Sequence, residues 1–198
     1  MKPFDLKLLD VPISLDCNLS CDNCNVYSNL KVSSETQNKQ SLHNDLINWK
    51  PFINPFRLQI IGGEPLLFKN LSSLIYTAKN AFPKAKLSLF SNGLLLKKNL
   101  HLLQVLKDTK CKLIISKHSN DKRYEKLLEE NIKSFIGDYA SYEIKNPTVT
   151  FAKTFRKDKF TFELRNMSNN WAKMYDDGVK PFNSDYIKAH NVCMWSHC

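Results

Sequence analysis

The chain has 198 residues, enough for one domain with a hydrophobic core, and its 42% apolar and 24% charged content is that of an ordinary globular protein. This composition excludes wholesale disorder. No apolar run approaches the roughly 18 residues that a membrane span needs. The first five residues lack the apolar core of a signal peptide. We therefore expect a cytoplasmic protein that does not associate with a membrane.

The formal net charge of +10 comes from 29 Lys and Arg against 19 Asp and Glu. A basic balance of this size can indicate nucleic-acid binding, but such proteins gather their positive charge in patches or stripes. Here the lysines are scattered, and the basic runs are pairs such as Lys97-Lys98. We interpret the excess as a solvated lysine-rich surface, with an anionic substrate or partner as the alternative. We do not expect nucleic acid as a partner.

Apolar residues recur at strand or helix spacing from residue 11 to residue 135. Strands are predicted at residues 11–15, 56–61, 86–91 and 111–116. Helices are predicted at residues 42–49, between Asn70 and Pro83, at residues 100–106, and from Asp121 to Phe135. Asn70 and Asp121 are the expected N-caps of their helices. The last helix is expected to turn Tyr124, Leu127, Leu128 and Phe135 inward.

The pattern changes beyond residue 140. Residues 142–145 are a candidate fifth strand, and residues 148–155 and 159–164 alternate around Lys157-Asp158 as in a β-hairpin. We assign residues 1–165 to the core domain and residues 166–198 to a C-terminal tail.

Alternating strands and helices predict an α/β fold with a parallel sheet and outer helices. In such folds, ligands bind at the carboxyl ends of the strands. Those ends carry four polar turns, which are the cysteine loop 17–24, the Gly-Gly-Glu-Pro segment 62–65, Ser91-Asn92-Gly93, and residues 116–119. The convergence of these turns on one edge predicts the functional site.

Three cysteines, Cys17, Cys21 and Cys24, follow the first strand at C-x3-C-x2-C spacing. Three thiolates can hold three irons of a 4Fe–4S cluster and leave the fourth iron open to a small chelating molecule. A zinc site with a fourth ligand such as His43 or Cys111 is one alternative, and a purely structural trio is another. Cys111 itself opens a predicted strand, where we expect a small core residue.

The cysteine motif followed by Gly62, Gly63, Glu64 and Pro65 resembles the radical S-adenosylmethionine (radical SAM) family. Ser91, Asn92 and Ser116, at the ends of the next two strands, support the resemblance, which covers roughly residues 10–145. It implies a partial (β/α)6 TIM-like barrel, with the cluster on Cys17, Cys21 and Cys24 and SAM on its open iron.

The resemblance also implies roles for the other turns. Residues 62–65 bind the amino group of SAM, for which the Glu64 carboxylate is a suitable acceptor, and Ser91, Asn92 and Ser116 lie near its methionyl and ribose parts. One electron from the reduced cluster then cleaves SAM, and the resulting 5′-deoxyadenosyl radical abstracts hydrogen from a substrate. The implied partners are an electron donor such as flavodoxin or ferredoxin and a small-molecule or peptide substrate.

Two departures from the family pattern concern adenine. Asn23 stands where the family usually has an aromatic residue, so we expect Tyr27 or Phe90 to pack on adenine instead. The family's glycine-containing pattern near a fifth strand is not found in this sequence.

The C-terminal tail resembles the start of a SPASM or twitch-type auxiliary-cluster domain that is truncated after Cys198. This interpretation rests on Trp171, Lys180-Pro181-Phe182 and the spacing of His190, Cys193, His197 and Cys198. The sequence thus predicts a radical SAM enzyme of unknown substrate. The alternatives are a non-catalytic module that binds zinc or an iron–sulfur cluster, and a basic RNA-binding protein.

Overall fold

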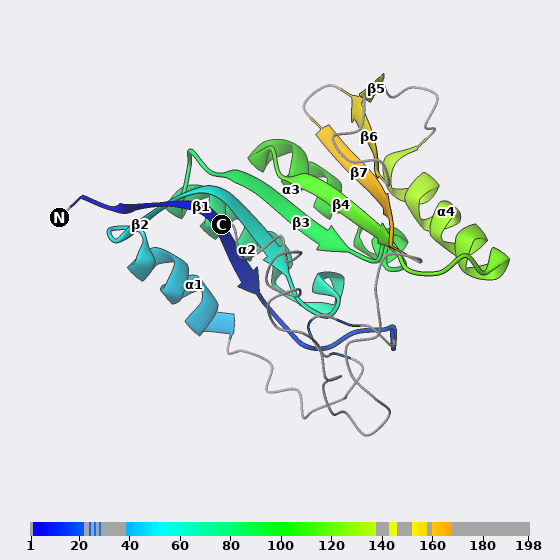
Figure 1. Cartoon of the computed structure of the whole chain (residues 1–198), viewed down its shortest axis with the longest axis horizontal. Coiled ribbons are helices and arrows are strands. Elements are labelled where there is room, and N and C mark those ends of the chain that lie inside the picture. Colours follow the sequence, from blue (N-terminus) through cyan, green and yellow to red (C-terminus); the bar gives the residue numbers. More distant parts are fainter. Residues whose placement is uncertain are drawn as a thin grey trace, which may run out of the picture.

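The computed structural model describes residues 2–21, 24, 26, 28, 39–137, 143–145, 152–157 and 160–167. Its elements are β1 (Phe4–Pro12), α1 (Lys39–Trp49), β2 (Ile53–Ile61), the 3-10 helix η2 (Pro65–Leu67), α2 (Leu71–Ala81), β3 (Lys86–Ser91), the 3-10 helix η3 (Leu96–Asn99), α3 (Leu102–Thr109), β4 (Lys112–Lys117), α4 (Lys122–Ile136), β5 (Glu143–Lys145), β6 (Ala152–Lys157) and β7 (Phe160–Asn166) (Figure 1).

The described strands form a single sheet in the order β1-β2-β3-β4-β7-β6-β5. The pairs from β1 to β4 are parallel, and β7 continues the sheet parallel to β4. Strands β6 and β5 extend it in antiparallel fashion. The predicted α/β fold with a parallel sheet and outer helices is confirmed. The predicted hairpin is confirmed as β6–β7, and the predicted fifth strand as β5.

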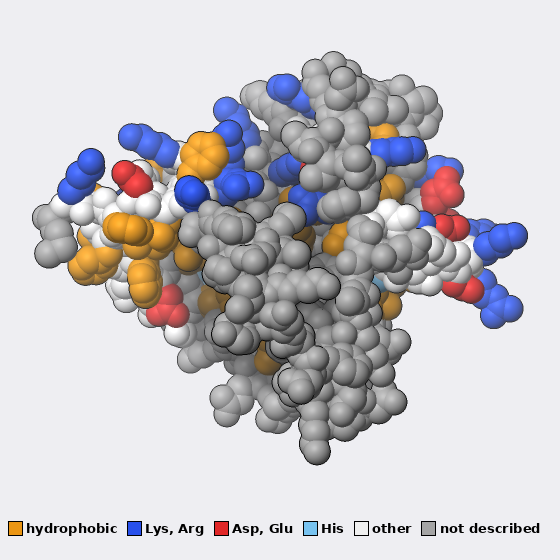
Figure 2. All heavy atoms as spheres, viewed as in Figure 1, with side chains coloured by type: hydrophobic (Ala, Val, Ile, Leu, Met, Phe, Trp, Pro, Cys, Tyr) orange, Lys and Arg blue, Asp and Glu red, His pale blue; other side chains and the backbone are white. Residues whose placement is uncertain are grey.

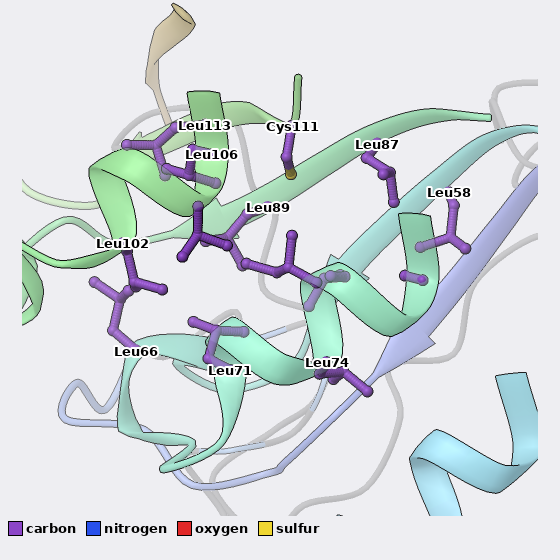
Figure 3. Close-up of a cluster of buried hydrophobic side chains, with 14 of the residues drawn as sticks. Leu58, Leu66, Leu71, Leu74, Leu87, Leu89, Leu102, Leu106, Cys111 and Leu113 are labelled. Atoms are coloured by element: carbon purple, nitrogen blue, oxygen red, sulfur yellow. The ribbon is translucent and has the colours of Figure 1, made fainter. Parts of the chain in front are cut away.

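The hydrophobic core lies between the sheet and its helices (Figure 3). Leu87 and Leu89 of β3 and Leu113 of β4 turn the same way, since alternate residues of a strand share a face, and all three are buried. They meet apolar side chains from α2 and α3 such as Leu74 and Leu106. This packing fixes the strands, and with them the turns at their carboxyl ends.

Strand β1 differs from the prediction, since it starts at Phe4 rather than residue 11 and ends at Pro12. Its first half has no apolar alternation because Phe4, Asp5 and Lys7 are exposed at the sheet edge. The backbone ladder to β2 defines this part of the strand, and hydrophobic periodicity cannot detect such a ladder. The ladder continues past the strand, where the Ile13 N–H donates to the Ile61 carbonyl at 3.0 Å.

The two predicted N-caps behave differently. The Asp121 carboxylate accepts hydrogen bonds from the N–H groups of Arg123 and Tyr124 at 2.9 and 3.1 Å, so it caps α4 as expected. Asn70 occupies the cap position of α2 but makes no side-chain cap bond. The expectation that Leu127 faces inward is wrong, because its side chain is 48% exposed.

The described Lys and Arg side chains are spread from one end of the visible face to the other (Figure 2). This distribution fits the predicted lysine-rich surface. Across the described helices, none is both long and apolar enough to cross a bilayer.

Candidate functional site

The four polar turns predicted to converge do so. The cysteine loop follows β1, the Gly-Gly-Glu-Pro segment follows β2, Ser91-Asn92-Gly93 ends β3, and Ser116 lies near the end of β4. These strands are neighbours in the sheet and run parallel, so all four turns lie along its carboxyl edge. Direct contacts join three of the turns into one structure.

The first contact joins the two glycines to the segment that leads into the cysteine loop. The Gly63 N–H donates to the Ser14 carbonyl at 2.8 Å, and the Glu64 N–H donates to the Asp16 carbonyl at 2.7 Å. A Cβ on Gly63 would lie 2.3 Å from the Asp16 carbonyl oxygen, and one on Gly62 would lie 2.5 Å from that of Ser14. Only glycine permits this approach, so the glycine pair fixes the position of the chain just before Cys17.

The second contact is made by the Glu64 carboxylate, which is fully buried. Its Oε1 accepts hydrogen bonds from the Leu66 N–H at 2.9 Å and the Ser91 hydroxyl at 2.8 Å, and its Oε2 accepts one from the Asn92 N–H at 2.7 Å. Burial raises the pKa of Glu64, while the bonds from Asn92, Leu66 and Ser91 act in the opposite direction. Glu64 therefore links the end of β2 to the turn after β3 through hydrogen bonds to both of its carboxylate oxygens.

The third contact comes from the side chain of Asn92, which is 4% exposed. Its amide nitrogen donates to Asn18 Oδ1 at 2.8 Å and lies 4.0 Å from Cys17 Sγ, within the limit for a hydrogen bond to sulfur. Its Oδ1 accepts from the Leu94 N–H at 3.0 Å. The side chain thus points at the cysteine loop.

The cysteine loop presents three free thiols, Cys17, Cys21 and Cys24, each half-buried. Burial raises the pKa of Cys17, the Leu19 N–H lowers it, and the charges of Glu64 and Cys24 raise it again. Such a thiol stays protonated near neutral pH until a metal displaces the proton. Sulfur donors in a half-buried loop with N–H groups directed at one of them suit an iron–sulfur cluster.

The zinc alternative needs a fourth ligand near this loop. Among the described residues, no group of three or more His, Cys, Asp or Glu side chains could hold one metal ion. In a cluster, by contrast, each cysteine binds a different iron, so the sulfurs need not converge on one point. The imidazole Nδ1 of His43 lies 2.7 Å from Thr77 Oγ1, joining α1 to α2. Cys111 is buried before β4 begins, at the opposite end of that strand from the loop.

Cys111 is therefore the small core residue that the sequence predicts, and Figure 3 shows it among buried leucines. Burial raises its pKa to about 12. We expect Cys111→Ala to retain full iron and sulfide content after anaerobic reconstitution and to cost about 1 kcal/mol of stability. The matched control, Cys21→Ala, should lose most of its iron. Equal losses in both variants would contradict this assignment.

Tyr124 is a residue near the site that sequence reasoning assigned only to packing. Its hydroxyl accepts a hydrogen bond from the His118 N–H at 3.2 Å. Burial raises the pKa of Tyr124 to about 12, and the charges of Cys21, Glu64 and Cys17 act in the same direction. The first turn of α4 therefore lies beside the cysteine loop. The sequence signal that could have placed Tyr124 near the site is its position in the first turn of the helix that follows the carboxyl end of β4.

Ser116 lies opposite Arg165 of β7 in the sheet, and the Arg165 guanidinium carbon is 5.3 Å from the centroid of the Phe90 ring. Phe90, one of the two aromatic residues expected to pack on adenine, thus has a cation against its ring. Glu163 is buried and pairs with both Arg165 and Lys112. Burial acts to raise its pKa, but these two cations outweigh that effect and lower it. Sequence reasoning missed this network, because Lys112 reaches Glu163 only through the pairing of β4 with β7.

Several residues named in the sequence analysis lie outside the described residues, so their interpretation stays a prediction. They are Asn23, Tyr27, Trp171, Lys180, Pro181, Phe182, His190, Cys193, His197 and Cys198.

Comparison with known proteins finds a family that matches this chain. Residues 13–133, more than half of the chain, match the family described as 4Fe-4S single cluster domain. This match confirms the predicted 4Fe–4S cofactor. No curated protein matches the chain.

Similar solved structures include BtrN in complex with AdoMet and 2-DOIA, with 23% identity over 62% of this chain and 49% of that one, at a TM-score of 0.46. Native anSMEcpe with bound AdoMet and Cp18Cys peptide has 20% identity over 66% of this chain and 40% of that one, at a TM-score of 0.47. This chain thus spans half or less of either structure. On the family match, the chain belongs to the 4Fe-4S single cluster domain family.

Proposed function

We propose that the chain is a radical SAM enzyme whose substrate is a small molecule or a peptide. The observation that carries this proposal is the direct contact between the two motifs. The backbone of Gly63 and Glu64 is hydrogen-bonded to the residues that lead into the cysteine loop. A molecule held by residues 62–65 would therefore lie next to a cluster held by that loop, as an enzyme that reduces SAM requires.

Each part of the site has a proposed role. Cys17, Cys21 and Cys24 hold three irons, and the fourth iron is left for the amino and carboxylate groups of SAM. When bound, the cluster would supply the electron for reductive cleavage of SAM, which is the chemistry needed to begin hydrogen abstraction from a substrate. The protein positions these reactants and excludes water from them.

The binding of SAM is assigned to the remaining strand ends. Because the Glu64 carboxylate is used internally, we assign the amino group of SAM to the backbone of residues 62–65. Ser116, half-buried near the end of β4, keeps its proposed place near the ribose. Ser91 and Asn92 hold the site together through their bonds to Glu64.

The experiment is electron paramagnetic resonance of the anaerobically reconstituted, reduced protein with and without SAM. We expect a 4Fe–4S signal that changes when SAM is added, because SAM binds the open iron. Cys21→Ala should show no such change. A wild-type signal that is indifferent to saturating SAM would contradict the proposal, and so would stoichiometric zinc without iron or sulfide in anaerobically purified protein.

An external electron donor such as flavodoxin or ferredoxin is part of this proposal, since the cluster must be reduced before each cleavage. The net charge of +10 favours an acidic protein as the donor, because opposite charges speed the encounter of two proteins.

A further inference from the structure

The sulfur of Cys17 has two N–H groups directed at it. The backbone N–H of Leu19 lies 3.4 Å away, and the side-chain amide nitrogen of Asn92 lies 4.0 Å away. The first is local to the loop, whereas the second comes from the turn after β3, on another part of the sheet. The backbone bond would survive most substitutions, so the Asn92 contact is the one that a side chain controls.

Hydrogen bonds to both the nitrogen and the oxygen of the Asn92 side-chain amide hold it in this orientation. Its second amide hydrogen is bonded to Asn18 Oδ1 at 2.8 Å, and its carbonyl oxygen accepts from the Leu94 N–H at 3.0 Å. Its own backbone N–H donates to Glu64 Oε2 at 2.7 Å. At 4% exposure, the side chain has no room to swing towards solvent. The N–H that faces Cys17 is therefore a fixed dipole.

A fixed N–H dipole beside a ligating sulfur has a defined electrostatic effect. Reduction adds one negative charge to a cluster, and part of that charge resides on the ligating sulfurs. Hydrogen bonds to those sulfurs stabilise the reduced form and raise the reduction potential. Leu19 and Asn92 both act in this direction, whereas the buried carboxylate of Glu64 acts against it.

We propose that Asn92 is a positioning residue that raises the reduction potential of the cluster through its N–H···S contact with Cys17. The inference rests on the iron–sulfur part of the proposed function but does not need SAM cleavage. It also gives Asn92 a role different from the contact with the methionyl or ribose part of SAM that its sequence position suggests.

The test is a spectroscopic redox titration of the reconstituted cluster in the full chain. Asn92→Asp keeps the oxygen that Leu94 uses but replaces the amide donor with a carboxylate oxygen. Asn18→Asp is the matched control, since it adds the same charge near the loop and leaves an acceptor for the Asn92 amide. The two variants therefore separate loss of the donor from gain of a charge.

We expect Asn92→Asp to lower the ratio of reduced to oxidised cluster at a fixed potential by about tenfold, which is about 59 mV for a one-electron couple. Asn18→Asp should give a clearly smaller change. An equal shift in both variants would show that the added charge alone changes the reduction potential. An unchanged potential in Asn92→Asp would show that the N–H···S contact does not affect it.

Two further variants keep the inference testable if Asn92→Asp fails to fold. Asn18→Leu removes the anchor of the amide, and Asn92→Gln keeps an amide but lengthens its side chain. Both should lower the reduced fraction with normal iron content, and an unshifted potential in both would overturn the inference. If the wild-type protein binds no cluster at all, the proposed function fails instead, so the two failures are distinguishable.

Discussion

Gly63→Ala is expected to destabilise the fold by about 3 kcal/mol and to remove most of the iron that the protein binds on reconstitution. A Cβ at this position would lie 2.3 Å from the Asp16 carbonyl oxygen and 2.6 Å from that of Leu15. Both are backbone atoms, so a side-chain rotation cannot relieve the clash. The chain before Cys17 must move away, and the Gly63–Ser14 hydrogen bond is lost with it. Urea unfolding and iron per chain measure the two effects.

The matched control is Gly137→Ala at the end of α4. No atom lies within 4 Å of a Cβ there, although φ is +78°, so this substitution carries backbone strain without a clash. We expect a cost of about 1 kcal/mol and normal iron content. If Gly63→Ala is no worse than Gly137→Ala, the close approach of the two motifs does not exist as described.

Glu64→Ala is expected to cost about 3 kcal/mol of stability as well. The substitution leaves the buried N–H groups of Leu66 and Asn92 without their acceptor, and each unsatisfied donor costs about 1–3 kcal/mol. The release of a buried charge offsets part of this loss. For a chain of this size the net change lowers Tm by about 6–12 °C. Differential scanning calorimetry is the measurement.

Glu129→Ala is the control for the loss of a carboxylate as such. Glu129 pairs with Lys133 on the exposed side of α4 at 2.6 Å, and both side chains are 55% exposed. We expect a change below about 0.5 kcal/mol. A similar loss of stability in Glu64→Ala and Glu129→Ala would mean that the buried hydrogen bonds of Glu64 add no more stability than an exposed ion pair does.

The stability difference between wild type and Glu64→Ala is expected to depend on pH with a defined sign. The folded-state pKa of Glu64 is raised, so in the window between its unfolded value near 4.3 and the raised folded value the native state binds more protons. The contribution of Glu64 is therefore full below that window and declines as the pH rises through the folded pKa. We expect the stability difference between wild type and Glu64→Ala to be larger below the window than above it. A difference that grows with rising pH would contradict the raised pKa.

Much of the fold follows from local patterns in the sequence. Leu74, Leu87 and Leu113 repeat at helix or strand spacing, and all three are buried as that spacing predicts. The turns that follow the strands are polar and rich in Gly and Asn, so the carboxyl edge could be identified as the site. The cysteine spacing favoured a 4Fe–4S cluster over zinc without excluding zinc, and the family match confirms the cluster.

The remaining features depend on contacts between distant residues. Glu64 and Asn92 are 28 positions apart, and only the pairing of β2 with β3 brings the carboxylate to the Asn92 N–H. The placement of β7 beside β4 likewise depends on tertiary packing rather than on hairpin periodicity. Sequence reasoning thus identified Glu64 and Asn92 as site residues, but it could not show that both are committed to bonds within the protein.

The central claim is that the contact between the two motifs serves reductive cleavage of SAM. The most direct measurement is the amount of 5′-deoxyadenosine formed, by liquid chromatography with mass spectrometry, when anaerobically reconstituted protein is incubated with SAM and a strong reductant. We expect 5′-deoxyadenosine at or above one equivalent per cluster for wild type and only background for Cys21→Ala. The same background level for both proteins, with a full 4Fe–4S complement in the wild type, would contradict it.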